Sequence, residues 1–139
     1  MVTKTIKPGT EQYNECLKLK EDLLLKPLGK VFSQEEISQE ESNECIAMYL
    51  EKRLVGTCSL IQEGRVLKIE NFVISPQFQN KGYGGRILNF CAKYALDNDC
   101  SVMYCEVEET MQKFYQKYGF RIDNQDTTTK RTKLRLRVN

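Results

Sequence analysis

The sequence predicts a mixed α+β fold with one central, mostly antiparallel sheet flanked by helices. Three apolar extended segments follow one another with short polar turns between them. A glycine-rich turn joins the third segment directly to a helical pattern, and a further strand-like segment leads to another helix. The 139 residues suffice for one core, so we expect a single domain over residues 1–139.

The N-terminal part predicts a strand and then a helix. Residues 2–6 alternate apolar and polar side chains before the turn at Pro8, which is typical of a short strand. Apolar residues recur at helical spacing from Tyr13 to Leu24, and Pro27 followed by Gly29 stops the run.

A polar segment over residues 33–43 predicts a short surface helix. Ser33 and Glu36 have the spacing of a capping box, in which each side chain satisfies the other's backbone N–H. Four acidic residues favour a solvated helix face and are also compatible with a cationic substrate: Glu35, Glu36, Glu40 and Glu41.

The other predicted elements follow in chain order. The three extended segments of the meander are 45–50, 54–61 and 66–74. A helix follows the glycine turn, then a strand over 101–107, a helix over 109–117, and strands over 120–122 and 132–138 around a polar turn at 123–129. In the last strand cations alternate with apolar residues, which favours an edge strand; a phosphate-binding patch is the alternative.

Composition limits the class of protein. Hydrophobic residues make up 40% and charged residues 29%, as in water-soluble globular proteins. Neither a basic leader with an apolar core nor a long uncharged apolar stretch occurs, so we expect a cytoplasmic protein without membrane contact. The six cysteines form no CxxC pair and mostly sit in apolar patterns, which predicts reduced core residues.

The absence of histidine excludes several kinds of catalysis. Ser-His-Asp and Cys-His nucleophiles and histidine-based metal sites cannot form, and we expect no metal. A formal net charge of +2 is too small to indicate a nucleic-acid partner. Carboxylates, tyrosine, lysine or backbone dipoles must carry the chemistry.

The glycine-rich turn has the features of an anion site. Gly82, Gly84 and Gly85 lie where a strand runs into a helix, and the first N–H groups of a helix lack intrahelical partners. The helix dipole adds positive potential there, and Lys81 and Arg86 add positive side chains. Glycines also serve tight turns for purely steric reasons, which is the alternative interpretation.

Two segments resemble the GNAT superfamily of acetyltransferases. The run Gln79-Asn80-Lys81-Gly82-Tyr83-Gly84 fits the family's Q/R-x-x-G-x-G/A signature, and residues 114–120, FYQKYGF, are similar to its FYxKxGF segment. Residues 23–29 also resemble a bacterial subgroup of small members. In contrast, Glu108 and Met111 stand where many members carry an asparagine and a small residue, so side-chain contacts to the cofactor are not expected from that region.

The resemblance implies a fold with splayed middle strands and acetyl-CoA as cosubstrate. The backbone of residues 72–74 would pair with the pantetheine arm, and the amides of residues 80–85 would hold the pyrophosphate. The implied cofactor-binding residues are Phe72, Val73, Ile74, Gln79, Asn80, Lys81, Gly82, Tyr83, Gly84, Gly85 and Arg86.

Acetyl transfer to an amine needs a base and an acid. A lysine-like amine, with a pKa of about 10.4, must lose its proton, and strand alternation puts Glu70 on the face of Phe72 and Ile74. Glu106 is the reserve base, and an ion-paired strand residue is the alternative for Glu70. Tyr115 occupies the family's position for the acid that protonates the coenzyme A thiolate; a core aromatic is the alternative.

We therefore expect an N-acetyltransferase that moves an acetyl group directly to a primary amine in a ternary complex. The acceptor would be a peptide or small-molecule amine. A non-catalytic acyl-CoA-binding module is the main alternative, and nucleic-acid binding by the basic last strand is another. Exposed edges of that strand would also permit a homodimer.

Overall fold

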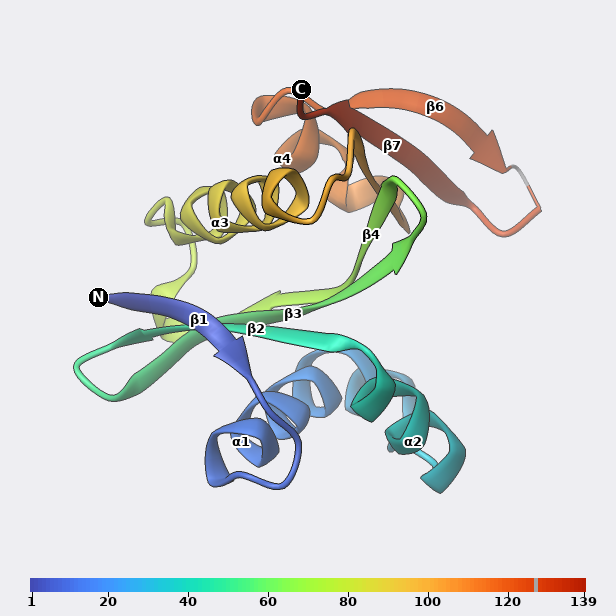
Figure 1. Ribbon diagram of the computed structural model, residues 1–139. Coiled ribbons are helices and arrows are strands. Elements are labelled where there is room, and N and C mark those ends of the chain that lie inside the picture. The colour runs from blue at the N-terminus through green and yellow to red at the C-terminus, as the bar shows by residue number, and fades with distance from the viewer. Residues whose placement is uncertain (127) are drawn as a thin grey trace. The chain divides into compact units, whose positions relative to one another are not determined.

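The computed structural model describes residues 1–126 and 128–139 (Figure 1). Its strands form one seven-stranded sheet in the order β1-β2-β3-β4-β5-β7-β6. The strands are β1 (Val2–Ile6), β2 (Glu44–Leu50), β3 (Arg53–Glu63), β4 (Val66–Ile74), β5 (Val102–Glu108), β6 (Arg121–Asp126) and β7 (Arg131–Arg137). β4 and β5 pair in parallel, whereas β1–β2, β2–β3, β5–β7 and β6–β7 are antiparallel. The predicted mixed, mostly antiparallel sheet is confirmed.

The helices occupy the predicted places in the chain. The α-helices are α1 (Glu11–Lys20), α2 (Gln34–Ser42), α3 (Tyr83–Asp97) and α4 (Gln112–Lys117). Shorter turns are the π-helical η1 (Glu21–Leu25) and the 3-10 turns η2 (Lys26–Leu28), η3 (Pro76–Phe78) and η4 (Glu109–Met111). In the described part of the chain, no helix has the length and apolar character needed to cross a membrane.

Contacts divide the chain into two compact units. The first unit comprises Met1–Ile61 and Asn71–Cys91, and the second comprises Gln62–Glu70 and Ala92–Asn139. The first unit contains α1, α2, β1 and β2, and the second contains β5, β6, β7 and α4.

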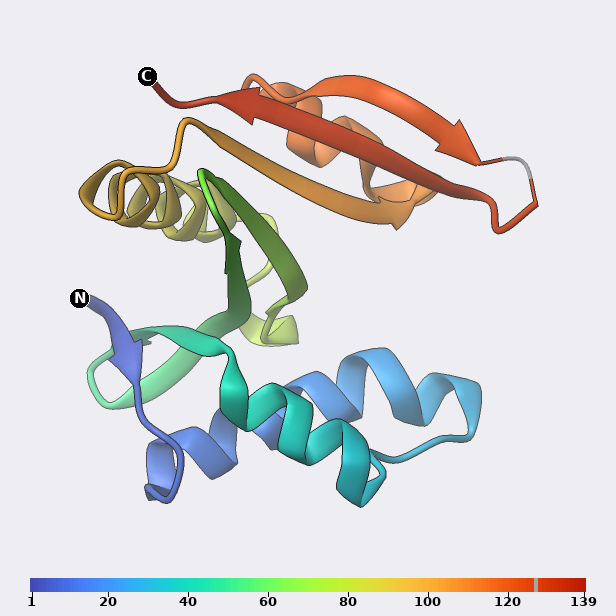
Figure 2. The same cartoon turned by 45° about the vertical axis from the view of Figure 1, so that its right-hand side comes forward.

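In the first unit, α1 and α2 lie on the same side of β1, β2 and β3 (Figures 1 and 2). Thr10 caps α1 by accepting from the Tyr13 backbone N–H at 3.1 Å. The predicted capping box at the start of α2 is present: Ser33 Oγ accepts from the Glu36 N–H, and a Glu36 carboxylate oxygen accepts from the Ser33 N–H. Gly29, at φ 72°, ends η2 in the left-handed conformation that glycine favours.

The core of the first unit lies where α1 packs against the strands β1 and β2. One buried cluster contains residues of β1, α1 and β2: Ile6, Tyr13, Cys16, Cys45, Ala47 and Tyr49. All six cysteines are buried and free, as predicted, and the sulfur atoms of Cys58 and Cys91 lie 3.7 Å apart. Burial of these small apolar side chains stabilises the packing of helices on strands.

In the second unit, β7 pairs with β5 on one side and β6 on the other, and the three strands run alongside one another in Figure 2. Apolar residues face each other across the β5–β7 ladder: buried Met103 lies opposite half-buried Leu136, and buried Cys105 lies opposite buried Leu134. The helix α4 ends before Gly119, whose φ of 95° is the left-handed conformation typical of a residue after a helix C-terminus.

Two predictions about the C-terminal strands are wrong. The last strand is not an edge strand, because β7 lies between β5 and β6. The strand predicted to end at residue 122 continues to residue 126, since pairing with β7 supplies backbone hydrogen bonds that polar residues 123–126 would not secure alone. The turn expected at 123–129 is thus shorter, and its residue 127 lies outside the described residues.

A third correction concerns α2. We expected its acidic residues to form a solvated face, but Glu40 is only 6% exposed. Glu35, Glu36 and Glu41 are exposed, as expected.

Candidate active site

The strand β4 changes character halfway along its length. Its parallel register with β5 runs from Val66 opposite Val102 to Ile69 opposite Cys105. Asn71, two residues later, has a φ of 52°, a left-handed conformation inside a strand. We expected the alternation of side chains along a strand to place Glu70 on the same face as Phe72 and Ile74. That alternation does not extend from Glu70 to residues 72–74, because a left-handed residue interrupts the extended path.

The end of β4 packs closely against β3 and α3. A Cβ added to Gly56 on β3 would lie 2.6 Å from Ile74 Cδ1, 2.8 Å from the Val73 carbonyl oxygen and 2.9 Å from Ile87 Cδ1. Only glycine allows this approach. Gly56 thus fixes how residues 73 and 74 lie against β3.

The loop from β4 to α3 is held by its own hydrogen bonds. The Ser75 N–H donates to the Val55 carbonyl oxygen at 2.8 Å, and the Phe78 N–H donates to the Ser75 carbonyl oxygen at 2.8 Å. Gln79 Nε2 donates to the Ile74 carbonyl oxygen at 2.9 Å. This contact gives the first residue of the predicted signature a local role in shaping the loop.

The glycine turn combines left-handed residues with the start of a helix. Asn80 and Gly82 have φ values of 61° and 83°, and α3 begins at Tyr83. Successive N–H groups in alternating conformations, followed by a helix N-terminus, form a nest that favours anions. A Cβ added to Gly82 would meet nothing within 4 Å, so the turn is open at this point.

The side chains of the turn fall into two groups. Lys81 and Arg86 are exposed, as expected for cations that would attract a phosphate, whereas Gly84 and Gly85 are buried. Tyr83 packs edge-on against Phe78, with ring centroids 5.9 Å apart. This contact is consistent with a packing role for Tyr83.

The two predicted carboxylates lie around one lysine of the second unit. Lys68 Nζ lies 3.6 Å from Glu70 Oε2 and 3.5 Å from Glu106 Oε1. The same ammonium lies 5.8 Å from the centroid of the Tyr104 ring. The structure therefore brings Glu70 and Glu106 together, and Glu70 is ion-paired here.

The environment of Lys68 favours its charged form. Partial burial lowers the pKa of Lys68, but the carboxylates of Glu70 and Glu106 outweigh it, so the net pKa lies above the ordinary value. The ammonium accordingly stays protonated at neutral pH. A positive group between two carboxylates shows that this face of the sheet accommodates an ammonium.

Tyr115 lies in the core of the second unit. Its side chain is 1% exposed, and its ring packs edge-on against Phe114 and Phe120 with centroids 5.1 and 5.2 Å away. The ring thus has the packing role that we considered as the alternative, and the acid role of its hydroxyl stays a proposal. Glu108 and Met111, where the sequence departs from the family pattern, are exposed.

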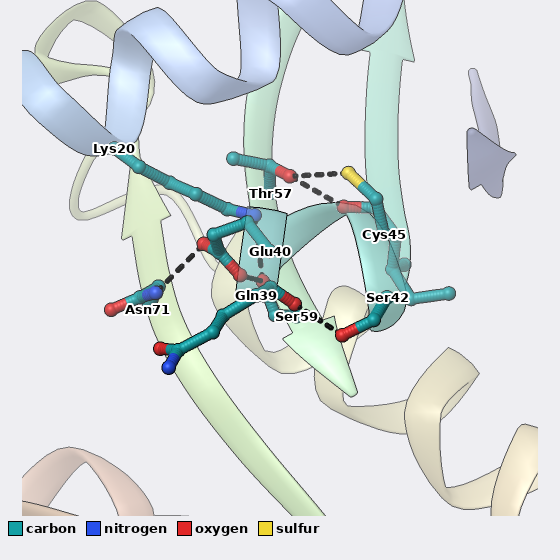
Figure 3. Close-up of polar contacts among 9 residues, drawn as sticks. Lys20, Gln39, Glu40, Ser42, Cys45, Thr57, Ser59 and Asn71 are labelled. Atoms are coloured by element: carbon teal, nitrogen blue, oxygen red, sulfur yellow. Dashed lines mark hydrogen bonds and ion pairs between the residues drawn. The ribbon is translucent and has the colours of Figure 1, made fainter. Parts of the chain in front are cut away.

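The sequence reasoning missed a buried network of Lys20, Glu40, Ser59 and Asn71 in the first unit (Figure 3). A signal for it exists in the sequence. Lys20 follows Cys16 by four residues, which places a charged side chain on the buried face of α1. An asparagine inside an apolar strand was the other sign, since asparagine is enriched in the left-handed conformation.

Several solved structures share the fold of this chain. A GNAT family acetyltransferase from Elizabethkingia anophelis with acetyl-CoA bound matches at a TM-score of 0.77 and 20% identity, over 98% of this chain and 97% of that one. An aminoglycoside 6'-N-acetyltransferase complexed with coenzyme A matches at 0.84 and 14%, over 100% and 98%. IAA acetyltransferase from Bacillus cereus ATCC 14579 matches at 0.75 and 18%, over 98% and 98%. At identities of 14–20%, these matches show a shared fold.

The family follows from the sequence itself. The model of the acetyltransferase (GNAT) family matches residues 11–120, and the chain therefore belongs to this family. No curated protein matches the sequence. The predicted family and enzyme class, an acyltransferase, are confirmed.

Proposed function

We propose that this enzyme transfers an acetyl group from acetyl-CoA directly to a primary amine, with both substrates bound in a ternary complex. The observation that carries the proposal is the turn before α3, where left-handed Asn80 and Gly82 precede a helix N-terminus within a GNAT-family sequence. Such a turn offers backbone N–H groups to a pyrophosphate. Acetyl-CoA carries that group and the acetyl thioester.

The cofactor contacts would come mainly from the backbone. The N–H groups of residues 80–85 would bind the pyrophosphate, with Lys81 and Arg86 adding charge, and the backbone of residues 72–74 would pair with the pantetheine arm. The open side of Gly82 and the close packing of Ile74 on Gly56 support this assignment. The Ile74 N–H would polarise the thioester carbonyl in the transition state.

Glu70 is the proposed base. A primary amine with a pKa of about 10.4 arrives as an ammonium and must lose a proton before it attacks the thioester carbon. Glu70 and Glu106 already flank an ammonium, that of Lys68, at 3.6 and 3.5 Å. An arriving ammonium would compete with Lys68 for these carboxylates, and Glu70 would take its proton directly or through a water.

Tyr115 is the proposed acid. Attack on the thioester forms a C–N bond, and collapse of the intermediate breaks the C–S bond and releases a thiolate. A phenol with a pKa of about 10 can protonate that thiolate. The FY pair at 114–115 matches the family segment that supplies this group.

The acceptor class is a small-molecule or peptide amine. The exposed acidic residues Glu35, Glu36 and Glu41 on α2 support a cationic acceptor.

We also propose that residues 1–139 form one domain, supported by a family match across segments of both units. A cytoplasmic location is supported by six buried free thiols, since disulfides form mainly in oxidising compartments.

The test is release of coenzyme A from acetyl-CoA in the presence of a panel of primary amines. Glu70→Gln and Tyr115→Phe should each lower kcat by about 100-fold, the usual scale for loss of a general base or acid. Two matched controls should stay near the wild-type rate: Glu109→Gln removes an exposed carboxylate of the same unit, and Tyr118→Phe removes a phenol one turn after Tyr115. Unchanged rates in both test variants would refute the assigned roles.

A non-catalytic acyl-CoA-binding module is the competing function. The observation that favours it is the departure at Glu108 and Met111 from the family pattern. Calorimetric binding of acetyl-CoA without turnover across the amine panel would select this alternative.

A further inference from the structure

A buried polar network joins four elements of the first unit (Figure 3). Lys20 ends α1 and Glu40 lies on α2; they are 2% and 6% exposed, with Nζ and Oε1 3.4 Å apart. The ammonium donates to Ser59 Oγ on β3 at 2.7 Å, and this hydroxyl donates to Glu40 Oε2 at 2.8 Å. Asn71 Nδ2 on β4 donates to Glu40 Oε1 at 2.8 Å. Both carboxylate oxygens are therefore engaged.

The charges in this network hold its geometry. Removing two charges from water is costly, and their attraction repays the cost only while hydrogen bonds satisfy the atoms that remain. Ser59 and Asn71 supply those bonds to Glu40. The carboxylate is thus a fixed acceptor for the Asn71 amide.

Asn71 has a backbone conformation that redirects β4. Its φ of 52° is left-handed, and asparagine is among the few non-glycine residues that adopt this region readily. A residue of this kind inside a strand bends the strand and re-aims the residues after it. The hydrogen bond to Glu40 ties that bend to the buried network.

The residues after the bend are those that we propose to pair with pantetheine. Ile69, two residues before Asn71, is the last residue of β4 in the register with β5. Residues 72–74 follow the bend directly, and Gln79 Nε2 donates to the Ile74 carbonyl oxygen at 2.9 Å. A side-chain amide therefore anchors each end of this short segment.

We propose that Asn71 is a positioning residue for acetyl-CoA: Glu40 holds it in the left-handed conformation, and that conformation aims residues 72–74 along the pantetheine arm. This inference rests on the proposed function. Asn71 acts through the backbone that follows it, and Lys20 and Ser59 act by fixing Glu40.

The test is the affinity of the purified full chain for acetyl-CoA and for coenzyme A, measured by calorimetry well below the melting temperature. Asn71→Leu disfavours the left-handed conformation and loses the amide, so Kd should rise by about tenfold. Asn71→Asp keeps the tolerance for this conformation but cannot donate to Glu40, so Kd should rise by about threefold.

The matched control is Asp99→Leu. Asp99 has a φ of 60°, so leucine at this position meets the same backbone cost as leucine at position 71. Asp99 belongs to the second unit, whereas residues 72–74 belong to the first. Its Kd for acetyl-CoA should stay within about twofold of wild type, while both leucine variants melt at lower temperature.

Three outcomes separate the hypotheses. Wild-type protein that binds neither acetyl-CoA nor coenzyme A would overturn the proposed function together with this inference. A second outcome is that the wild type binds acetyl-CoA and Asn71→Leu binds it with the same Kd, although its melting temperature falls as much as that of Asp99→Leu. This outcome would overturn only the inference. Should Asn71→Leu not fold, Asn71→Asp decides, and an unchanged Kd there refutes the positioning role.

Discussion

Two lysine–carboxylate clusters of this enzyme use the same side chains in opposite environments. In the first unit, Lys20 and Glu40 lie 3.4 Å apart and are 2% and 6% exposed. In the second unit, Lys68 is 25% exposed and lies 3.6 and 3.5 Å from Glu70 and Glu106, which are 42% and 45% exposed. The separations are nearly equal, and access to water is what differs.

That difference sets what each cluster can do. The buried carboxylate cannot leave its partners without stranding a charge in the interior, so it serves to hold geometry. The exposed carboxylates can exchange one cation for another, because water compensates the change. A site that must accept and release a substrate ammonium needs the second kind of cluster.

The largest effect should come from breaking the buried pair. Glu40→Ala leaves the Lys20 ammonium buried without its counter-charge and should lower the free energy of unfolding by about 3–5 kcal/mol. Urea denaturation followed by circular dichroism measures this. Glu106→Ala is the matched control and should cost at most about 1 kcal/mol, as exposed ion pairs do.

Equal losses in Glu40→Ala and Glu106→Ala would remove the basis of the comparison. They would mean that water reaches the first cluster in solution as readily as the second.

A smaller effect should follow removal of the exposed cluster's cation. Lys68→Met should change the free energy of unfolding by less than about 1 kcal/mol, and its difference from wild type should shrink near 1 M salt, where the screening length falls to about 3 Å. Lys113→Met, at an exposed lysine of α4, controls for loss of one positive charge. A salt-independent difference would show that Lys68 acts by packing.

The smallest effect concerns Glu36, an exposed carboxylate on the helix that also carries buried Glu40. Hydrogen bonds from the Ser33 N–H and hydroxyl lower the pKa of Glu36 below its ordinary value. The stability from this bond is present above the unfolded pKa of about 4.3 and is lost as pH falls through the folded pKa.

The corresponding measurement is the melting temperature of wild type and Glu36→Ala from about pH 7 to about pH 3. The wild type should melt higher at neutral pH, and the gap should narrow in acid. A gap that stays constant would assign the effect to helix propensity rather than to the ionised capping box.

Much of the fold was predictable because local signals agreed with it. Three features lie where the sequence predicts them: the capping box at Ser33, the end of the first helical segment at Gly29 and the turn before Tyr83. Each depends only on residues that are neighbours in the chain. The extent of β6 was not predictable, because polar residues 123–126 form a strand only through pairing with β7.

The candidate site divides in the same way. The glycine turn was predictable from its motif, and its left-handed residues Asn80 and Gly82 agree with that reading. The link between Asn71 and Glu40 was not, since it joins residues 31 positions apart through a side-chain bond. Periodicity assigns Glu40 to a helix but does not show that its face packs toward β4.

The interior position of β7 affects how the chain assembles during synthesis. β5 and β6 are both translated before Arg131–Arg137, yet each takes its ladder partner from that strand. Neither can complete its backbone hydrogen bonds while those seven residues are still inside the ribosome. Nascent chains halted before residue 131 would therefore expose unpaired strand edges.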